Sequence, residues 1–121
     1  MLSPREIQLC ARAIHLVNSI HSIAVGDPPG PTWENLTSPQ QETMIEGIRH
    51  ALAGGTPEES HDLWVKSRIA EGWVQGPVKD FKKKVSPSLV PYAELPDAIK
   101  KKDTLFQELA RSFAASLPQR E

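Results

Sequence analysis

The stretch SHDLWVKSRIAEGWVQGPVKD, residues 60–80, carries two of the chain's three tryptophans and changes character half-way along. Its first half has helical spacing, which predicts a helix over residues 57–71 that ends at Gly72. The residues on adjacent turns of that helix are His61, Trp64, Val65 and Arg68. The segment 73–76 that follows is predicted to be extended and to lead into a basic loop. A tryptophan between nearby glycines, beside a proline and a lysine, needs an explanation beyond simple core packing.

Three helix starts can be located from capping boxes that contain a proline. In such a box the hydroxyl accepts from a free backbone N–H, a Glu or Gln side chain reaches back, and proline has no N–H to leave unpaired. The boxes are Ser3-Pro4-Arg5-Glu6, Ser38-Pro39-Gln40-Gln41 and Thr56-Pro57-Glu58-Glu59. They predict helices over residues 4–25, 39–53 and 57–71, with Gly26 as a left-handed cap at the end of the first.

The C-terminal third is predicted to contain a small β element and one more long helix. Residues 88–92 form a second extended segment, which either pairs with 73–76 in a two-stranded hairpin or remains a separate arm. Residues 95–97 begin a short helical turn, and apolar spacing predicts the last helix over 103–116. The predicted fold class is mainly α, a compact bundle of about four to five helices with a small two-stranded β element. It forms a single domain over residues 1–121, with the N-terminal helix at 4–25 and the repeat core at about 33–117.

Composition argues against several classes of protein. The 14 basic and 15 acidic residues give a net charge of -1. Non-specific binding to nucleic acid depends on net positive charge, so no nucleic-acid partner is expected. The single cysteine, Cys10, excludes an internal disulfide and favours a reducing compartment. No signal-peptide pattern and no apolar run of membrane-spanning length is found. We therefore expect a cytoplasmic protein with no membrane partner.

The sequence gives little support for catalysis. Ser60, His61 and Asp62 are consecutive on a predicted helix and point in different directions, which excludes a catalytic triad. The cysteine and the four scattered histidines match no zinc-ligand spacing. Gly54-Gly55 lacks the Lys-Ser/Thr that follows the glycines of a phosphate loop. We expect no enzyme activity, no catalytic residues, no metal and no cofactor.

An ordered string of motifs from the opening stretch onward resembles the repeat domain of ryanodine receptors. The matching motifs are His61, Leu63-Trp64, Arg68-Ile69, Glu71-Gly72-Trp73, Gly76-Pro77-Val78, Lys79-Asp80, Pro87, Leu89-Val90-Pro91-Tyr92 and Leu95-Pro96. This resemblance spans roughly residues 33–113. The N-terminal part is similar to the small stand-alone version of the domain in bacteria and their phages. The residues that carry this second likeness are Ala11, His15, Asn18, Gly26-Asp27 and Trp33.

The resemblance implies a mainly helical fold with a few short strands and a nucleotide-binding function. In the large receptors two tandem repeats face each other around an adenine nucleotide, and the tryptophan of the Gly-Trp pair, here Trp73, stacks on the base. Stand-alone relatives resemble binders of nucleotide signals in bacterial defence, and phage versions resemble sponges for such signals. With one copy of the repeat, the resemblance implies a homodimer in which Trp73 of each chain faces inward. Gln75 stands where many relatives have an aromatic residue, which implies a more polar wall.

Residues around Trp73 are candidates for contacts with a phosphate and a ribose. Lys79 is the first lysine of the basic loop, and Arg68 shares a helical face with Trp64, although an ion pair at the core edge explains Arg68 equally well. Asp80 either accepts from a ribose hydroxyl or caps the turn. Trp73 either stacks on a base, which would contribute roughly 1–3 kcal/mol, or closes the helix end as a core residue.

Other candidates also have two open interpretations. Tyr92 either packs on the core or lines the pocket. His15 and Asn18 lie one turn apart on the first helix and form either a core network or part of the site. Lysines 100–102 are predicted to form a solvated face. Buried positions are predicted for Trp33, Trp64 and His61.

The leading prediction is non-enzymatic binding of a nucleotide-derived signalling molecule, adenine- or ADP-ribose-like. In a phage protein acting in the host cytoplasm, this binding would sequester an immune signal. The predicted ligand-binding residues are Trp73, Gln75, Lys79, Asp80, Arg68, Tyr92, His15 and Asn18. The alternative is a protein–protein interaction domain without a small ligand, in which the basic loop docks an acidic partner. Cleavage of a cyclic nucleotide is a third possibility, for which the sequence offers no base or metal site.

Overall fold

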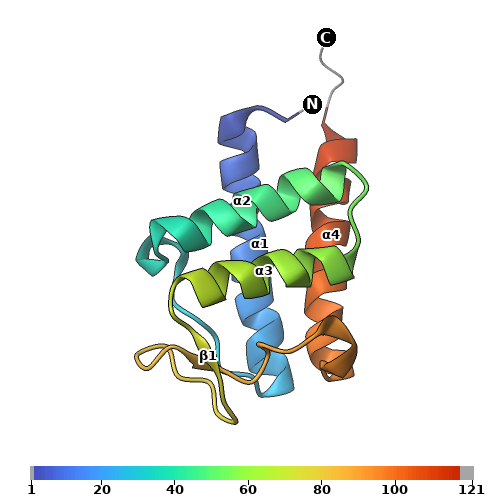
Figure 1. Ribbon diagram of the computed structural model, residues 1–121. Helices are drawn as coiled ribbons and strands as arrows, with labels where there is room; N and C mark the ends of the chain where they lie inside the picture. The colour runs from blue at the N-terminus through green and yellow to red at the C-terminus, as the bar shows by residue number, and fades with distance from the viewer. Residues whose placement is uncertain (1, 118–121) are drawn as a thin grey trace.

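The computed structural model describes residues 2–117 and has four long helices in two layers. Helices α2 and α3 lie side by side and cross α1 and α4, which run next to each other in the second layer (Figure 1). The elements in chain order are α1 (Pro4–Val25), a 3-10 turn at Trp33–Asn35, α2 (Ser38–Leu52), α3 (Pro57–Ala70), β1 (Val74–Gln75), β2 (Val85–Ser86), a second 3-10 turn at Tyr92–Glu94, and α4 (Asp97–Ser116). The predicted mainly helical class with a small two-stranded element is confirmed.

Helix α1 begins and ends as the sequence predicts. The Ser3 hydroxyl accepts from the backbone N–H of Glu6 at 3.2 Å, and the Glu6 carboxylate accepts from the backbone N–H of Ser3 at 2.8 Å. Gly26 closes the helix with φ 77°, in the left-handed region that glycine adopts without a Cβ penalty. The third capping box, at Thr56, starts α3 in the same way.

Helix α2 has its cap one residue earlier than predicted. Thr37, and not Ser38, accepts from the backbone N–H of Gln40 at 3.2 Å, and the Gln40 side chain accepts from the N–H of Thr37 at 3.2 Å. Two overlapping boxes compete here, because both hydroxyl residues have a glutamine three positions later. The second glutamine, Gln41, instead donates to the Trp33 carbonyl at 2.8 Å, which leaves the Thr37 box as the cap.

Replacing Thr37 with alanine is expected to lower the free energy of unfolding by about 1 kcal/mol, the usual cost of a lost helix cap. The hydroxyl of Thr37 also donates to Glu71 at 2.8 Å, so the substitution removes a link between α2 and the end of α3. Ser38→Ala is the matched control and should change stability by less than about 0.5 kcal/mol. Urea unfolding of both variants is the measurement, and a larger loss for the Ser38 variant would contradict this assignment.

The β element differs from the predicted hairpin. Strand β1 pairs with β2 in parallel, Val74 opposite Val85, and residues 88–92 contain no strand. The cause is a tight turn between the strands, in which the Asp80 carboxylate accepts from the backbone N–H groups of Lys82 and Lys83 at 2.9 and 3.0 Å. This turn pairs Asp80 antiparallel with Val85, and the bends at residues 77–78 have already reversed the chain once after β1. Two reversals between the strands leave β2 running in the same direction as β1.

Helix α4 is longer than predicted. The expected turn at 95–97 and the expected helix over 103–116 are one continuous helix, because lysines 100–102 are good helix formers and join the two parts. The core lies between the two helix layers. Its fully buried members include Ile14, Ile48, Ala51 and Ala110. Within residues 2–117, none of the helices combines the length and apolarity needed to cross a bilayer.

Candidate functional site

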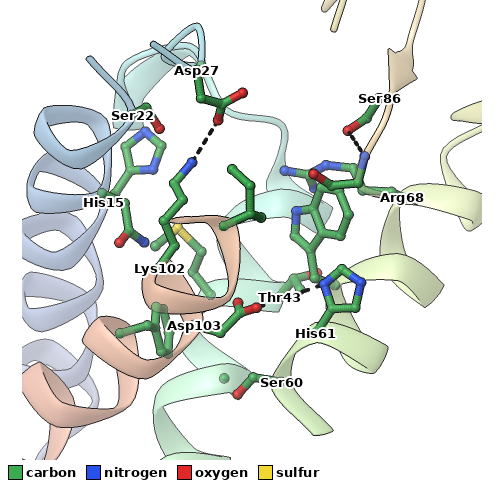
Figure 2. Close-up of a pocket in the computed structure, with 18 of the residues that line it drawn as sticks. His15, Ser22, Asp27, Thr43, Ser60, His61, Arg68, Ser86, Lys102 and Asp103 are labelled. Carbon is green, nitrogen blue, oxygen red and sulfur yellow. Dashed lines mark hydrogen bonds and ion pairs between the residues drawn. The ribbon is translucent and has the colours of Figure 1, made fainter. Parts of the chain in front are cut away.

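A cavity of about 210 Å³ lies where the four helices meet the two long loops. Helix α1 contributes His15, Asn18, Ser19 and Ser22, and α3 contributes five residues that include both His61 and Trp64. The loop after α1, the segment around β1 and β2, and the first turns of α4 complete the walls. Figure 2 shows Asp27 and the Lys102 ammonium group toward one end of this cavity, and Asp103 and Ser60 toward the other.

One end of the cavity has an excess of positive charge. The ammonium groups of Lys79 and Lys102 lie 3.3 and 3.0 Å from the same carboxylate oxygen of Asp27. Burial and the charge of Lys102 hold the pKa of Lys79 below its usual value, although Asp27 partly offsets this effect. Burial alone would raise the pKa of Asp27, but the hydrogen bonds and charges of both lysines leave it below its usual value. Two lysine ammonium groups thus share one carboxylate. We call Lys79, Lys102 and Asp27 together the cation end.

The Arg68 guanidinium lies against two tryptophans in the cavity wall. Its central carbon is 5.3 Å from the ring centroid of Trp64 and 5.6 Å from that of Trp73. His61 stacks on Trp64 with centroids 5.6 Å apart, and Phe81 meets Trp73 edge-on at 5.6 Å. These residues form a continuous aromatic wall. Because Arg68 covers part of the Trp73 ring, a ligand that stacks there has to share the ring with the guanidinium or displace it.

Arg68 was considered either as a phosphate contact or as part of an ion pair at the core edge, and its position is compatible with both. It lines the cavity, and its guanidinium also lies 3.8 Å from the Glu71 carboxylate, an ion pair too long for a hydrogen bond. Burial lowers the pKa of Arg68, and the charge of Glu71 partly offsets this. Arginine nevertheless stays protonated in proteins, so the wall keeps a third positive charge.

Two cavity-lining residues have buried polar atoms without a hydrogen-bond partner in residues 2–117. They are the indole Nε1 of Trp73, a donor, and the Oδ1 of Asn18, an acceptor. Trp73 is only 5% exposed, so water cannot satisfy its N–H freely. Unpaired buried polar atoms are costly and uncommon in native proteins. The cavity wall therefore contains one unpaired donor and one unpaired acceptor, and a polar ligand could form hydrogen bonds with both.

The opposite end of the cavity contains a partly buried carboxyl group, that of Asp103, whose pKa is raised. Burial raises the pKa of Asp103 to about 7, although the charge of Lys102 opposes the rise. Its carboxyl oxygen lies 4.0 Å from Nδ1 of His61. The Nε2 of His61 donates to the Val90 carbonyl at 2.7 Å, since a carbonyl can only accept. The sequence-based prediction of a buried histidine bonded to the backbone is confirmed.

The structure places five of the eight predicted site residues in the cavity lining: His15, Asn18, Arg68, Trp73 and Lys79. His15 is held by the Pro31 carbonyl, which accepts from its Nε2 at 2.7 Å. Residues of one chain are sufficient to line this cavity, and Trp73 is among them. The expected arrangement of Trp73 across a dimer stays a prediction.

Three predicted residues lie outside the lining. Gln75 is exposed on β1. Asp80 caps the turn of the basic loop, one of the two roles considered for it. Tyr92 packs against His61 with centroids 6.1 Å apart and carries Lys100 over its ring at 5.5 Å, so it supports the wall from behind.

The sequence reasoning missed Asp27, Lys102 and Asp103, and it misjudged Trp64. Trp64 was predicted to be core, but it is partly exposed and lines the cavity, with Arg68 and His61 against its ring. Lysines 100–102 were predicted to form a solvated face, which is wrong for Lys102, whose side chain is 19% exposed. The helical period of α4 was the available signal, since Lys102 and Phe106 lie one turn apart.

Metal binding finds no support in the described part of the chain, where no three His, Cys, Asp or Glu side chains are placed to hold an ion. The polar lining is instead rich in hydroxyl groups, which can donate to or accept from a ligand. These residues are Ser19, Ser22, Thr43, Ser60, Ser86 and Ser88. Positive charge at one end, an aromatic wall and hydroxyl groups suit a ligand with an anionic group and a flat polar ring.

Residues 29–116 match the family model described as RyR domain. The matched segment contains α2, α3, both strands and α4, and it ends at the last residue of that helix. Helix α1 lies before it. The cavity is therefore built from both parts, because α1 supplies His15, Asn18 and Ser22 to its wall.

Proposed function

The chain belongs to the RyR domain family, and we propose that it binds a nucleotide-derived signalling molecule, adenine- or ADP-ribose-like, in the cavity between its helices. The observation that carries the proposal is the cavity lining itself. It combines the cation end, the aromatic wall and two unpaired buried polar atoms. Ligand sites typically pair apolar and aromatic walls with a few convergent polar groups.

In the proposed complex each part of a nucleotide meets a matching group. The phosphate approaches Lys79 and Lys102, which then exchange part of their interaction with Asp27 for charge-assisted bonds to the phosphate. The base packs against the indoles of Trp64 and Trp73, where aromatic stacking contributes roughly 1–3 kcal/mol per base. The ribose lies among the hydroxyl groups of the wall.

The size of the cavity restricts the ligand. Ligand pockets usually measure roughly 300–1,000 Å³, and this cavity of about 210 Å³ is smaller. It accommodates a group of nucleoside size, with the phosphate at the cation end. A cyclic dinucleotide, which carries two nucleosides, would need a substantial opening of the walls. We therefore expect ligands with one base to bind better than cyclic dinucleotides.

We propose binding without chemical conversion. Of the carboxyl groups that line the cavity, Asp27 is occupied by two lysines and Asp103 is paired only with His61 at 4.0 Å. A binder of this kind would act by sequestering or sensing its ligand, and a phage protein would use it to remove an immune signal from the host. Recovery of intact ligand from the denatured complex supports binding alone, whereas recovery of a cleaved product would identify an enzyme.

The first test is thermal stabilisation with ATP, ADP-ribose, cyclic ADP-ribose isomers and cyclic dinucleotides. A ligand that binds only the native state stabilises it by about 2.7 kcal/mol at a hundredfold excess over its Kd. We expect a clear rise in Tm with at least one single-base ligand and little or none with cyclic dinucleotides. A panel without any shift would reject the proposal.

Lys102→Ala is expected to weaken binding of the identified nucleotide by roughly 10–100-fold, because a hydrogen bond to a charged group contributes about 1.5–3 kcal/mol. Lys101→Ala is the matched control, since Lys101 is its exposed neighbour on α4 and lies outside the cavity lining. Isothermal titration calorimetry on both variants, after circular dichroism has shown that they are folded, is the measurement. Equal affinities of the two variants would rule out the cation end as the phosphate site.

A protein-interaction role is the second candidate, and a specific surface favours it. The basic loop exposes Lys82, Lys83 and Lys84, and Val78 beside them is 72% exposed. An exposed apolar residue among cations is suited to an acidic partner with an apolar anchor. This candidate would be preferred if no nucleotide stabilises the protein and a charge reversal in the loop abolishes a measured protein contact.

A further inference from the structure

Helix α1 carries a line of large apolar side chains that face solvent. Leu9, Leu16, Ile20 and Ile23 are 50, 64, 59 and 67% exposed, and we call them the α1 stripe. At 100° per residue they fall within a narrow sector of the helix, opposite the sector of the buried Ile14. A surface helix normally has polar residues on this face, so the stripe departs from the usual amphipathic pattern.

The sequence around the stripe lacks the charges that would keep such a face in water. No Asp, Glu, Lys or Arg occurs between Ala13 and Val25. The nearest charge is Arg12, at the edge of the stripe, and it is paired within the chain with Glu34. The exposed Arg5 lies one turn before Leu9, at the N-terminal end of the stripe. The rest of the stripe offers a charged partner no charge to recognise, which favours an apolar partner surface.

The spacing of the stripe matches a second copy of itself. Leu9 and Ile23 each lie seven residues, about two helical turns, from Leu16. If two α1 helices pack antiparallel about a two-fold axis at Leu16, Leu9 of one chain meets Ile23 of the other, and Leu16 meets Leu16. Ile20 then meets the aliphatic stem of Arg12, whose charged end stays in water. Such self-complementarity is what a two-fold interface requires.

We propose that the protein forms a two-fold dimer through the α1 stripe. The four side chains present on the order of 400 Å² of apolar surface per chain, a size at which exposed patches are often functional. With the flanking Ala13 and the Arg12 stem, a pair of chains would bury roughly 1,000 Å² in total, the area that a specific interface needs. This inference is independent of the nucleotide proposal, because no stripe residue lines the cavity and Asn18, which does, lies on the opposite face of α1. Figure 1 shows α2 and α3 crossing α1 on one side only.

The experiment is sedimentation velocity of the full chain over a range of concentrations, with two matched variants. Ile20→Lys places a charge in the stripe, and Ile69→Lys places the same charge on α3 at a residue that is also 59% exposed. We expect the wild type and Ile69→Lys to be dimers, and Ile20→Lys to dimerise roughly 100-fold more weakly or not at all. A monomeric wild type, or an Ile20→Lys variant that dimerises normally, would overturn the proposal.

A cysteine at Leu16 tests the two-fold axis directly. In Leu16→Cys the two new thiols would lie opposite each other, and mild oxidation should give a covalent dimer. The wild type is the control, because its only cysteine, Cys10, is buried and should not cross-link. A Leu16→Cys protein that stays monomeric under oxidation would reject this axis. Binding of the stripe to lipid vesicles or to a different protein, in place of self-association, would also reject the dimer.

Discussion

Trp73→Ala is expected to lower the free energy of unfolding by about 3–5 kcal/mol, the usual cost of truncating a buried aromatic residue. Trp73 is 5% exposed, Phe81 packs edge-on against it, and the Arg68 guanidinium lies over its ring. Alanine would leave these two neighbours facing an enlarged void. Urea or thermal unfolding measures the loss, and a change below about 1 kcal/mol would show that Trp73 does not support the fold.

This expected loss determines how the binding role of Trp73 can be tested. An alanine variant that fails to bind a nucleotide could simply be unfolded. Trp73→Phe keeps one aromatic ring and removes the pyrrole part of the indole, including the N–H that has no partner in residues 2–117. It is expected to cost about 1–2 kcal/mol in stability, less than alanine does. Val74→Ala, at a residue 57% exposed, controls for changes in the adjacent strand and should cost less than about 0.5 kcal/mol.

The two interpretations of Trp73, core residue and ligand platform, do not exclude each other in this fold. The residue closes the end of α3 and is buried like a core residue, and it also lines the cavity. If the nucleotide proposal holds, Trp73→Phe should retain the fold and weaken binding, because the unpaired N–H is then a lost ligand contact. Unchanged affinity in that variant would exclude the indole N–H as a ligand contact and leave stacking as the binding role of residue 73.

The helices could be predicted because their signals are local. Each capping box joins residues three positions apart, and Gly26 requires only its own backbone conformation. The β element could not be predicted in the same way. Its second strand depends on where the turn at Asp80 returns the chain, and that turn depends on a side chain bonded to two backbone N–H groups. Alternation over two-residue strands is too short to carry a periodic signal.

The site was predicted where its residues are close in sequence or share a helix face. Arg68, Trp73 and Lys79 lie within one stretch, and His15 and Asn18 lie one turn apart on α1. The cation end could not be found in this way, because Asp27 and Lys102 are separated by 75 residues and meet only through the packing of α1 against α4. A lysine run normally indicates a solvated face; the one-turn spacing of Lys102 and Phe106 singles out the inward lysine but does not identify Asp27 as its partner.

Asp103→Asn is expected to make the protein more stable than the wild type at pH 8, by a margin that shrinks by about 3 kcal/mol at pH 5 and disappears only near pH 3. The folded pKa of Asp103 is raised to about 7 from an ordinary value of 3.8, mainly by burial. The folded state therefore holds a proton that the unfolded state releases, so this group's contribution to stability is fully present below pH 3.8 and is lost as the pH rises through about 7. At about 1.4 kcal/mol per pKa unit, the ceiling of the effect is about 4 kcal/mol.

Asparagine is the appropriate substitution because it resembles the neutral form of Asp103 and cannot ionise. The groups that face Asp103 are His61, whose Nδ1 is 4.0 Å away, and Lys102, whose charge opposes the raised pKa. The decisive quantity is the difference between variant and wild type, measured by urea unfolding at pH 5 and at pH 8.

The expected result is a difference that grows by about 2–4 kcal/mol between these two pH values. Asp62→Asn, at an exposed carboxylate on α3, supplies the control and should show little growth. If Asp103→Asn loses stability equally at both pH values, the carboxylate is ionised throughout and supports the fold by its charge. In that case the end of the cavity that contains Asp103 would be negatively charged, and only the cation end could accept a negatively charged ligand.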